Sequence, residues 1–91
     1  MSVQSVIPFT IADKKSLRTE YVRQRSLNDA VIVGLNIQLS RALDEDKPYI
    51  LHKIKQVEEN QIVFQSRIVQ LNRELFQLKK QYPLQYSASL N

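Results

Sequence analysis

The chain has 91 residues, no cysteine and one histidine, His52, which excludes a disulfide framework and a thiolate metal site. Its formal net charge is +4, and it contains only one glycine and three prolines. This scarcity of helix-breaking residues argues against a turn-rich β domain and favours long, uninterrupted elements. We expect a soluble intracellular protein, cytoplasmic or nuclear, because residues 1–15 lack a secretory pattern and the longest apolar run, 30–33, cannot cross a bilayer.

Residues 1–9 are expected to form an extended N-terminal arm, and residues 10–43 a first helix. Thr10 and Asp13 resemble a capping signal at its start. An apolar stripe near its end is typical of a buried helix face, and it consists of Val31, Ile32, Leu35, Leu39, Ala42 and Leu43. Residues 30–40 also alternate as a strand would. We favour the helix, because an isolated two-stranded ribbon is only marginally stable.

A connector at 44–47 leads into a second predicted helix, residues 48–82. Pro48 suits the first turn of a helix, where its missing N–H would be unpaired anyway. Asp46 can cap this helix, and Pro83 ends it. Residues 83–91 are then expected to form a flexible C-terminal tail.

The second helix carries a heptad seam, in which apolar residues recur at alternating spacings of four and three. Its members are Ile50, Ile54, Val57, Gln61, Phe64, Ile68, Leu71, Leu75, Leu78 and Tyr82. With Ile54 as position a, Gln61 is the one polar interruption. Gln61 either selects the register and partner of the seam or marks a hydrated position.

A second apolar stripe runs along the same helix at position b of the heptad: Ile62, Val69 and Phe76. Two stripes indicate a helix that is covered from two sides. The predicted fold is therefore all-α, an elongated antiparallel helical hairpin with coiled-coil-type packing inside a multi-chain helical bundle. The predicted partner-binding residues are Ile54, Val57, Gln61, Phe64, Ile68, Leu71, Leu75, Leu78, Ile62, Val69 and Phe76.

A basic run lies in the first predicted helix: Lys14, Lys15, Arg18, Arg23 and Arg25. Such a run could bind the phosphates of a nucleic acid or an acidic lipid surface. The alternative is a solvated helix face or a set of salt bridges to an acidic partner. We favour this alternative, because a basic composition in a short chain discriminates poorly and no base-reading motif is present.

No constellation of residues indicates catalysis, cofactor binding or metal binding, because one glycine cannot form a phosphate loop and His52 has no second histidine or cysteine to join it. We expect a non-catalytic structural or adaptor subunit that acts as a scaffold for other helical chains, with a hetero-oligomer favoured and a homodimer possible. The alternatives are a small nucleic-acid-binding accessory protein and a membrane-surface or SNARE-like tethering helix. In architecture alone, the pattern resembles the small helical subunits of large eukaryotic assemblies.

Overall fold

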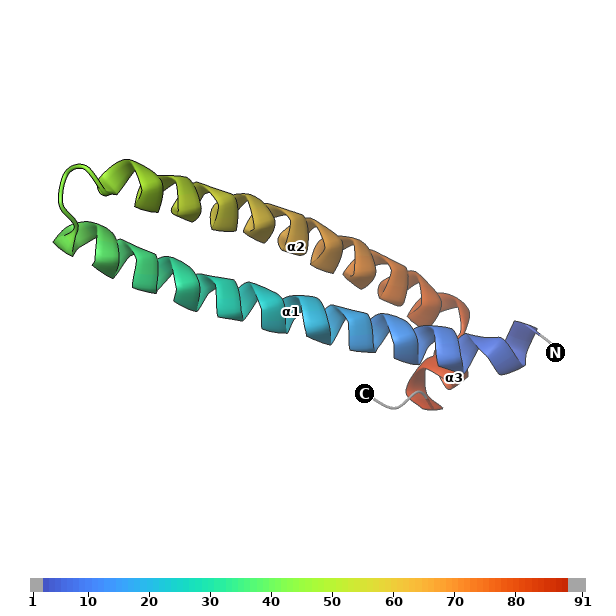
Figure 1. Cartoon of the computed structure of the whole chain (residues 1–91). Coiled ribbons are helices and arrows are strands. Elements are labelled where there is room, and N and C mark those ends of the chain that lie inside the picture. The colour runs from blue at the N-terminus through green and yellow to red at the C-terminus, as the bar shows by residue number, and fades with distance from the viewer. Residues whose placement is uncertain (1–2, 89–91) are drawn as a thin grey trace.

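The computed structural model describes residues 3–88, with side chains from residue 6 onwards. Over this range the chain forms α1 (Val3–Arg41), α2 (Lys47–Gln81) and the short α3 (Pro83–Ala88), with no strand. The two long helices lie side by side and antiparallel (Figure 1). The molecule measures 62 × 20 × 17 Å, and its radius of gyration is 19.1 Å, against about 12 Å for a compact chain of this length. The predicted all-α, elongated helical hairpin is confirmed.

The stretch 30–40, for which a strand was the alternative, is part of α1. Within it, Leu35 is buried and Ile32 and Leu39 are half-buried, whereas the intervening Val33 and Ile37 are exposed. Burial therefore follows the three- and four-residue spacing of a helix rather than the two-residue alternation of a strand.

The expectation of an extended arm at 1–9 is wrong for residues 3–9, because α1 begins at Val3 and continues through Pro8. Thr10 does not cap the helix but lies inside it, where its hydroxyl donates a hydrogen bond to the carbonyl oxygen of Val6 (3.3 Å). Ile11 is fully buried, and it belongs to α1, the helix that contacts both α2 and α3. Pro8 lies near the start of α1 and removes one of its backbone hydrogen bonds, while Ile7 and Pro8 themselves are half-buried.

The turn between the long helices is close to the predicted connector, with α2 starting at Lys47 and Pro48 in its first turn. Asp46 occupies the N-cap position, but its side chain makes no capping hydrogen bond, contrary to expectation. The turn is held instead by the Asp46 N–H, which donates to the carbonyl oxygen of Leu43 (2.9 Å), and by an ion pair between Lys47 and Asp44 (3.0 Å).

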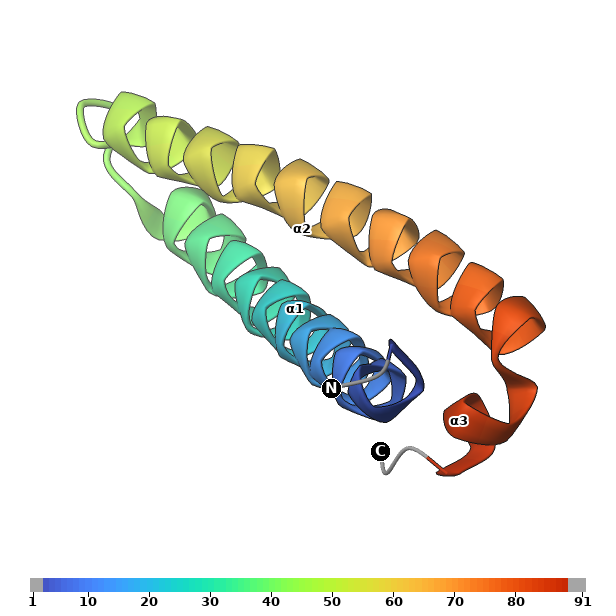
Figure 2. The same cartoon turned by 90° about the vertical axis from the view of Figure 1, so that its right-hand side faces the viewer.

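The expectation of a flexible tail at 83–91 is wrong for residues 83–88, which form α3; residues 89–91 lie outside the described part of the chain. α2 ends at Gln81, and the N–H of the C-cap residue Tyr82 donates to the carbonyl oxygen of Leu78 (2.8 Å). The chain then turns back, so that α3 lies beside the N-terminal part of α1 (Figure 2). There the ammonium group of Lys15 lies 4.3 Å from the ring centroid of Tyr86, and this cation–π contact helps to order the end of the chain.

The buried core is thin and lies between the two long helices. Among the described side chains, the buried apolar residues are Ile11, Leu35, Ile54, Ile68, Leu71 and Leu75. Four of these six belong to the seam of α2, which makes this seam the main source of hydrophobic stabilisation.

Truncation of a seam residue should cost far more than truncation of an exposed residue of the same type. Leu75 is 2% exposed and Leu51, on the same helix, is 52% exposed. We expect Leu75→Ala to lower the free energy of unfolding by about 2–5 kcal/mol, and Leu51→Ala by less than about 1 kcal/mol. Urea unfolding followed by circular dichroism measures both values. Equal costs would contradict the packing of this seam against α1.

Candidate protein-binding surface

The seam of α2 packs against α1 of the same chain. All eight seam residues that were predicted to bind partners are buried or half-buried: Ile54, Val57, Gln61, Phe64, Ile68, Leu71, Leu75 and Leu78. At mid-length the ring of Tyr21 on α1 lies 6.0 Å from that of Phe64 on α2, with the rings tilted by 35°. The first neighbour of α2 is therefore α1, which leaves the seam little surface for another chain.

Gln61 forms a polar layer across the hairpin. Its side-chain Nε2 donates to the backbone carbonyl oxygen of Arg25 (2.9 Å) and to Oδ1 of Asp29 (2.6 Å). Its Oε1 is buried and has no hydrogen-bond partner. Because the two hydrogen bonds form only at one alignment of the helices, this layer favours one register at a cost in stability.

The basic run supplies polar ties between the two long helices. Lys14 pairs with Glu74 (2.9 Å), and Arg18 donates to the side-chain oxygen of Asn72 (3.0 Å). One heptad further along α1, Arg25 donates to Oε1 of Gln65 (2.5 Å). Three of the five basic residues are thus directed across the interface between α1 and α2, toward acceptors in the same chain.

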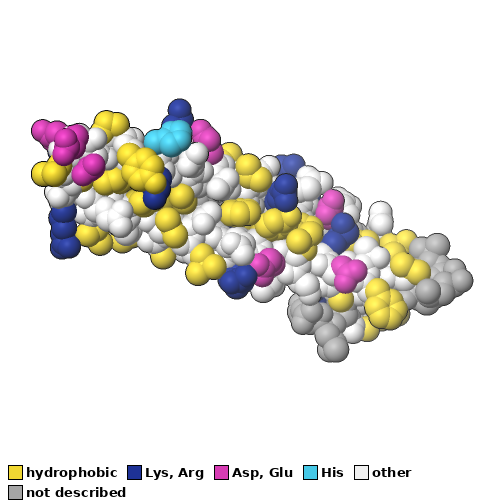
Figure 3. All heavy atoms as spheres, in the orientation of Figure 1, with side chains coloured by type: hydrophobic (Ala, Val, Ile, Leu, Met, Phe, Trp, Pro, Cys, Tyr) yellow, Lys and Arg dark blue, Asp and Glu magenta, His cyan; other side chains and the backbone are white. Residues whose placement is uncertain are grey.

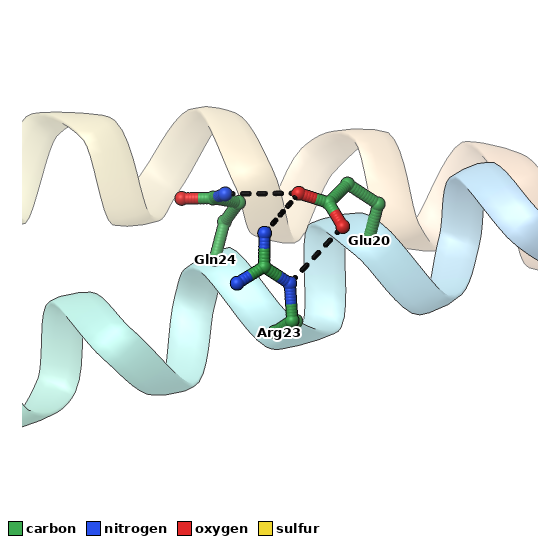
Figure 4. Close-up of polar contacts among 3 residues, drawn as sticks. All are labelled: Glu20, Arg23 and Gln24. Carbon is green, nitrogen blue, oxygen red and sulfur yellow. Dashed lines mark hydrogen bonds and ion pairs between the residues drawn. The ribbon is translucent and has the colours of Figure 1, made fainter.

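The other two members of the run point elsewhere. Lys15 is buried, with 8% of its surface exposed, and lies over Tyr86 of α3. Arg23 is exposed and donates twice to Glu20, at 2.6 and 3.1 Å, while Gln24 donates to the same carboxylate at 2.9 Å (Figure 4). The five cationic groups do not converge on one exposed patch, and polyanion binding by this run, the less favoured interpretation, stays untested.

The second stripe of α2 faces away from α1. Ile62 is 70% exposed, Val69 37% and Phe76 57%. Because these residues are seven apart, two helical turns, they lie on one face of α2. A shallow groove lined by Arg25, Asp29, Gln61, Ile62, Gln65 and Ser66 runs beside the first of them. The structure thus separates the two stripes, since one is buried within the hairpin and the other is open.

Exposed apolar side chains occur along the whole molecule. In the space-filling view they are scattered over the visible face from end to end, between charged groups (Figure 3). Other exposed apolar residues of the described chain lie on both long helices, and they include Phe9, Leu27, Val33 and Leu51. Among the described residues, only Ile62, Val69 and Phe76 are exposed apolar side chains at the same position of three consecutive heptads, and such a repeat is the pattern that helix–helix packing requires.

Two carboxylates have depressed pKa values. Hydrogen bonds from Arg23, and secondarily from Gln24, lower the pKa of Glu20 from its ordinary value of 4.5 to about 2. The hydrogen bond from Lys14 lowers the pKa of Glu74, against the opposing effect of partial burial. Both glutamates therefore stay ionised in the folded chain at neutral pH and keep their ion pairs.

The described residues contain no group of three or more His, Cys, Asp or Glu side chains arranged to hold a metal ion. None of the described helices has an apolar stretch long enough to span a membrane. His52 lies exposed on α2.

Sequence reasoning did not identify which acceptors the basic run contacts. Glu74 and Asn72 are unremarkable positions on α2, and only the antiparallel alignment brings them opposite Lys14 and Arg18. In an antiparallel helix pair, one known cross-helix contact defines which other residues face each other. A contact such as that of Gln61 with Asp29 would therefore have predicted these pairs.

A scan against protein-family models finds no match for this chain, and searches of curated proteins and of solved structures find none either. No relative supplies a role for any residue, so the function has to be inferred from the chemistry of the surface.

For the free energy of unfolding, the hydrogen-bond donor of the Gln61 side chain should matter more than the presence of a polar group at this position. Gln61→Glu places a carboxylate against the carbonyl oxygen of Arg25 and the carboxylate of Asp29, so that acceptors face acceptors. We expect this change to lower the free energy of unfolding at pH 7 by about 1–3 kcal/mol. Gln61→Leu removes the unpartnered Oε1 together with the donor, and we expect a change within about 1 kcal/mol.

The matched control is the same substitution one turn away. Gln65 accepts a hydrogen bond from Arg25, so Gln65→Glu should be neutral or stabilising in the same urea titrations. If Gln61→Glu were as stable as the unchanged chain, the polar layer would not hold the register.

The contact between Glu20 and Arg23 should stabilise the hairpin in a pH-dependent way. Because folding depresses the pKa of Glu20 to about 2, its contribution is fully present above pH 4.5 and is lost as the pH falls toward 2. The difference in melting temperature between the unchanged chain and Glu20→Gln should shrink over that window. Arg23→Gln removes the main donor, so in its background Glu20→Gln should have little effect at any pH. A difference that is constant from pH 7 to 2 would contradict the assignment.

Proposed function

We propose that this chain is a non-catalytic structural or adaptor subunit, which joins other helical protein chains into a complex through the outer face of α2. The observation that carries the proposal is the exposed stripe of Ile62, Val69 and Phe76, at 70%, 37% and 57% exposure. Apolar side chains in a regular row on the surface of a helix mark a site for helix packing.

The hairpin leaves this stripe uncovered for a geometric reason. A helix has room for neighbours on several sides, but α1 covers only the side of α2 that carries Leu71 and Leu75. The stripe lies at position b of the heptad, on a flank that a two-helix arrangement leaves in water. A helix from another chain would complete a bundle of three or more helices and remove this apolar surface from water.

The elongated shape supports a scaffolding role. A rod 62 Å long offers a helix surface along its length rather than an enclosed pocket. The ties from Lys14, Arg18 and Arg25 to α2 hold the two helices in one alignment, so the outer face of α2 is presented as a preformed surface. A preformed surface loses less conformational entropy on binding than a disordered one.

The proposal is tested by removal of the stripe while the seam is kept. Val69→Ser with Phe76→Ser takes two apolar contacts out of the outer face, and neither residue belongs to the buried core. We expect unchanged helicity by far-ultraviolet circular dichroism, and affinity for the partner chain weaker by roughly 30-fold or more, from a loss of about 2 kcal/mol or more. Purification of the tagged chain from its host, with identification of the co-purifying chains, supplies the partner for the affinity measurement.

A matched control places the same change on the other helix. Leu27 and Val31 on α1 are 49% and 46% exposed, so Leu27→Ser with Val31→Ser removes a comparable apolar area. This control should keep the partner. If both double variants lose it equally, the outer face of α2 has no special role; if the stripe variant unfolds, both stripes serve one fold.

A further inference from the structure

The exposed stripe of α2 is bounded by acidic residues at one end and by basic residues at the other. In chain order this face consists of Glu58, Glu59, Ile62, Val69, Phe76, Lys79 and Lys80. The acidic pair lies one turn before the first apolar residue, and the basic pair lies one turn after the last. On each side of Val69, the next apolar residue of the stripe lies seven residues away. The two charged residues on each side lie ten and eleven residues away. The spacing is therefore the same on both sides of Val69, whereas the charges at the two ends of the stripe are opposite.

We propose that a second copy of this chain docks on the stripe, with α2 antiparallel to α2 and a two-fold axis passing at Val69. The proposal rests on the proposed function, in that the stripe is a protein interface, and it names the occupant. Rotation about this axis places Ile62 against Phe76 of the partner subunit, and Val69 against its own copy. One exposed stripe thereby covers the other.

The rows that flank the stripe are complementary in this arrangement. Position e lies on one side of position b and position f on the other, and in an antiparallel pair each flanking row faces its own copy. In row e, Glu58 faces the partner's Lys79. In row f, Glu59 faces the partner's Lys80. The two-fold axis repeats both contacts, so that every one of these charges meets its opposite.

Between the α2 residues of the two copies, the middle of the interface contains no like-charge contact. In row e, Gln65 faces the partner's Asn72, and in row f, Arg73 faces the partner's Ser66. Gln65 and Asn72 are already oriented by hydrogen bonds that they accept from α1. The donors are Arg25 and Arg18, so these two arginine side chains lie at the edge of the interface on the side of row e.

A parallel pair is disfavoured by the same charges. With both helices in the same direction, the acidic pair at residues 58 and 59 would meet its own copy, and so would the basic pair at residues 79 and 80. Like charges across a helix interface are destabilising, so the charge pattern selects the antiparallel direction.

The four charged groups are available for a partner. Over residues 3–88, Glu58 and Glu59 are exposed and take part in no ion pair or hydrogen bond. Lys79 and Lys80 are exposed, and their ammonium nitrogens lie 5.7 Å from the ring centroid of Tyr86 and 5.3 Å from that of Phe76, respectively. The second contact places a positive charge at the edge of the stripe itself.

An interface built from three apolar residues of each copy is small, and small interfaces are weak. We therefore expect a dimer in the micromolar range, in equilibrium with monomer. Analytical ultracentrifugation of the full chain at low salt, from low to several hundred micromolar concentration, measures this equilibrium. Low salt is chosen because exposed ion pairs are screened.

Charge reversal gives the decisive pattern. The variant E58K/E59K and the variant K79E/K80E each bring like charges together at both ends, and each should dimerise at least about tenfold more weakly than the unchanged chain. The fourfold variant E58K/E59K/K79E/K80E restores every pair, and so does an equimolar mixture of the two double variants. Both should regain the unchanged affinity. Circular dichroism of each variant verifies that the helices remain.

The outcomes separate this inference from the proposed function. The antiparallel homodimer is overturned if the chain stays monomeric, or if its dimerisation is unaffected by charge reversal. The proposed function would still hold in that case if Val69→Ser with Phe76→Ser abolished binding of another protein chain. If this stripe variant dimerises as well as the unchanged chain and keeps its partner, both the inference and the proposed function fail. Weakened double variants with a restored fourfold variant support the homodimer.

Discussion

The packing of the α2 seam against α1 is the interaction on which the rest of the structure depends. Leu71 and Leu75 of this seam are 6% and 2% exposed, and the seam supplies four of the six buried apolar residues of the described chain. The flanks of this interface are polar rather than apolar. The ion pair between Lys14 and Glu74 and the contacts of Gln61 bring specific groups opposite one another, so hydrophobic burial drives the pairing while polar contacts align it.

A two-helix hairpin has only one interface, and this constraint determines what the surface can do. Each helix buries one stripe and exposes the remainder of its circumference, so a helix with two apolar stripes cannot satisfy both within the chain. The exposed row of Ile62, Val69 and Phe76 follows from this geometry. The same geometry places the polar and charged side chains of the described residues mainly along the outside of a rod.

The role of the basic run can be interpreted only once the helices are aligned. On α1 alone, Lys14, Arg18 and Arg25 resemble a cationic patch. In the hairpin each is directed to an acceptor on α2, namely Glu74, Asn72 and Gln65. The excess charge at the end of α2 behaves differently, because Lys79 and Lys80 lie beside exposed apolar surface, with their ammonium nitrogens near aromatic rings. Charges beside an apolar stripe influence the orientation of a docked helix, whereas charges within a hairpin interface influence its own register.

The sequence by itself determined the two long helices, their antiparallel order and the presence of two stripes on the second helix. These features depend on local periodicity and on Pro48, Pro83 and the short connector, all of which act over a few residues. Only the tertiary structure decided which stripe faces α1, where the chain ends are helical, and what the basic run contacts. Helix at residues 3–9 contains Pro8, which local pattern disfavours, and the fold-back of α3 involves the ring of Tyr86 over Lys15. Such contacts join residues about seventy positions apart, and their energies cannot be read from a local pattern because they exist only after the helices have aligned.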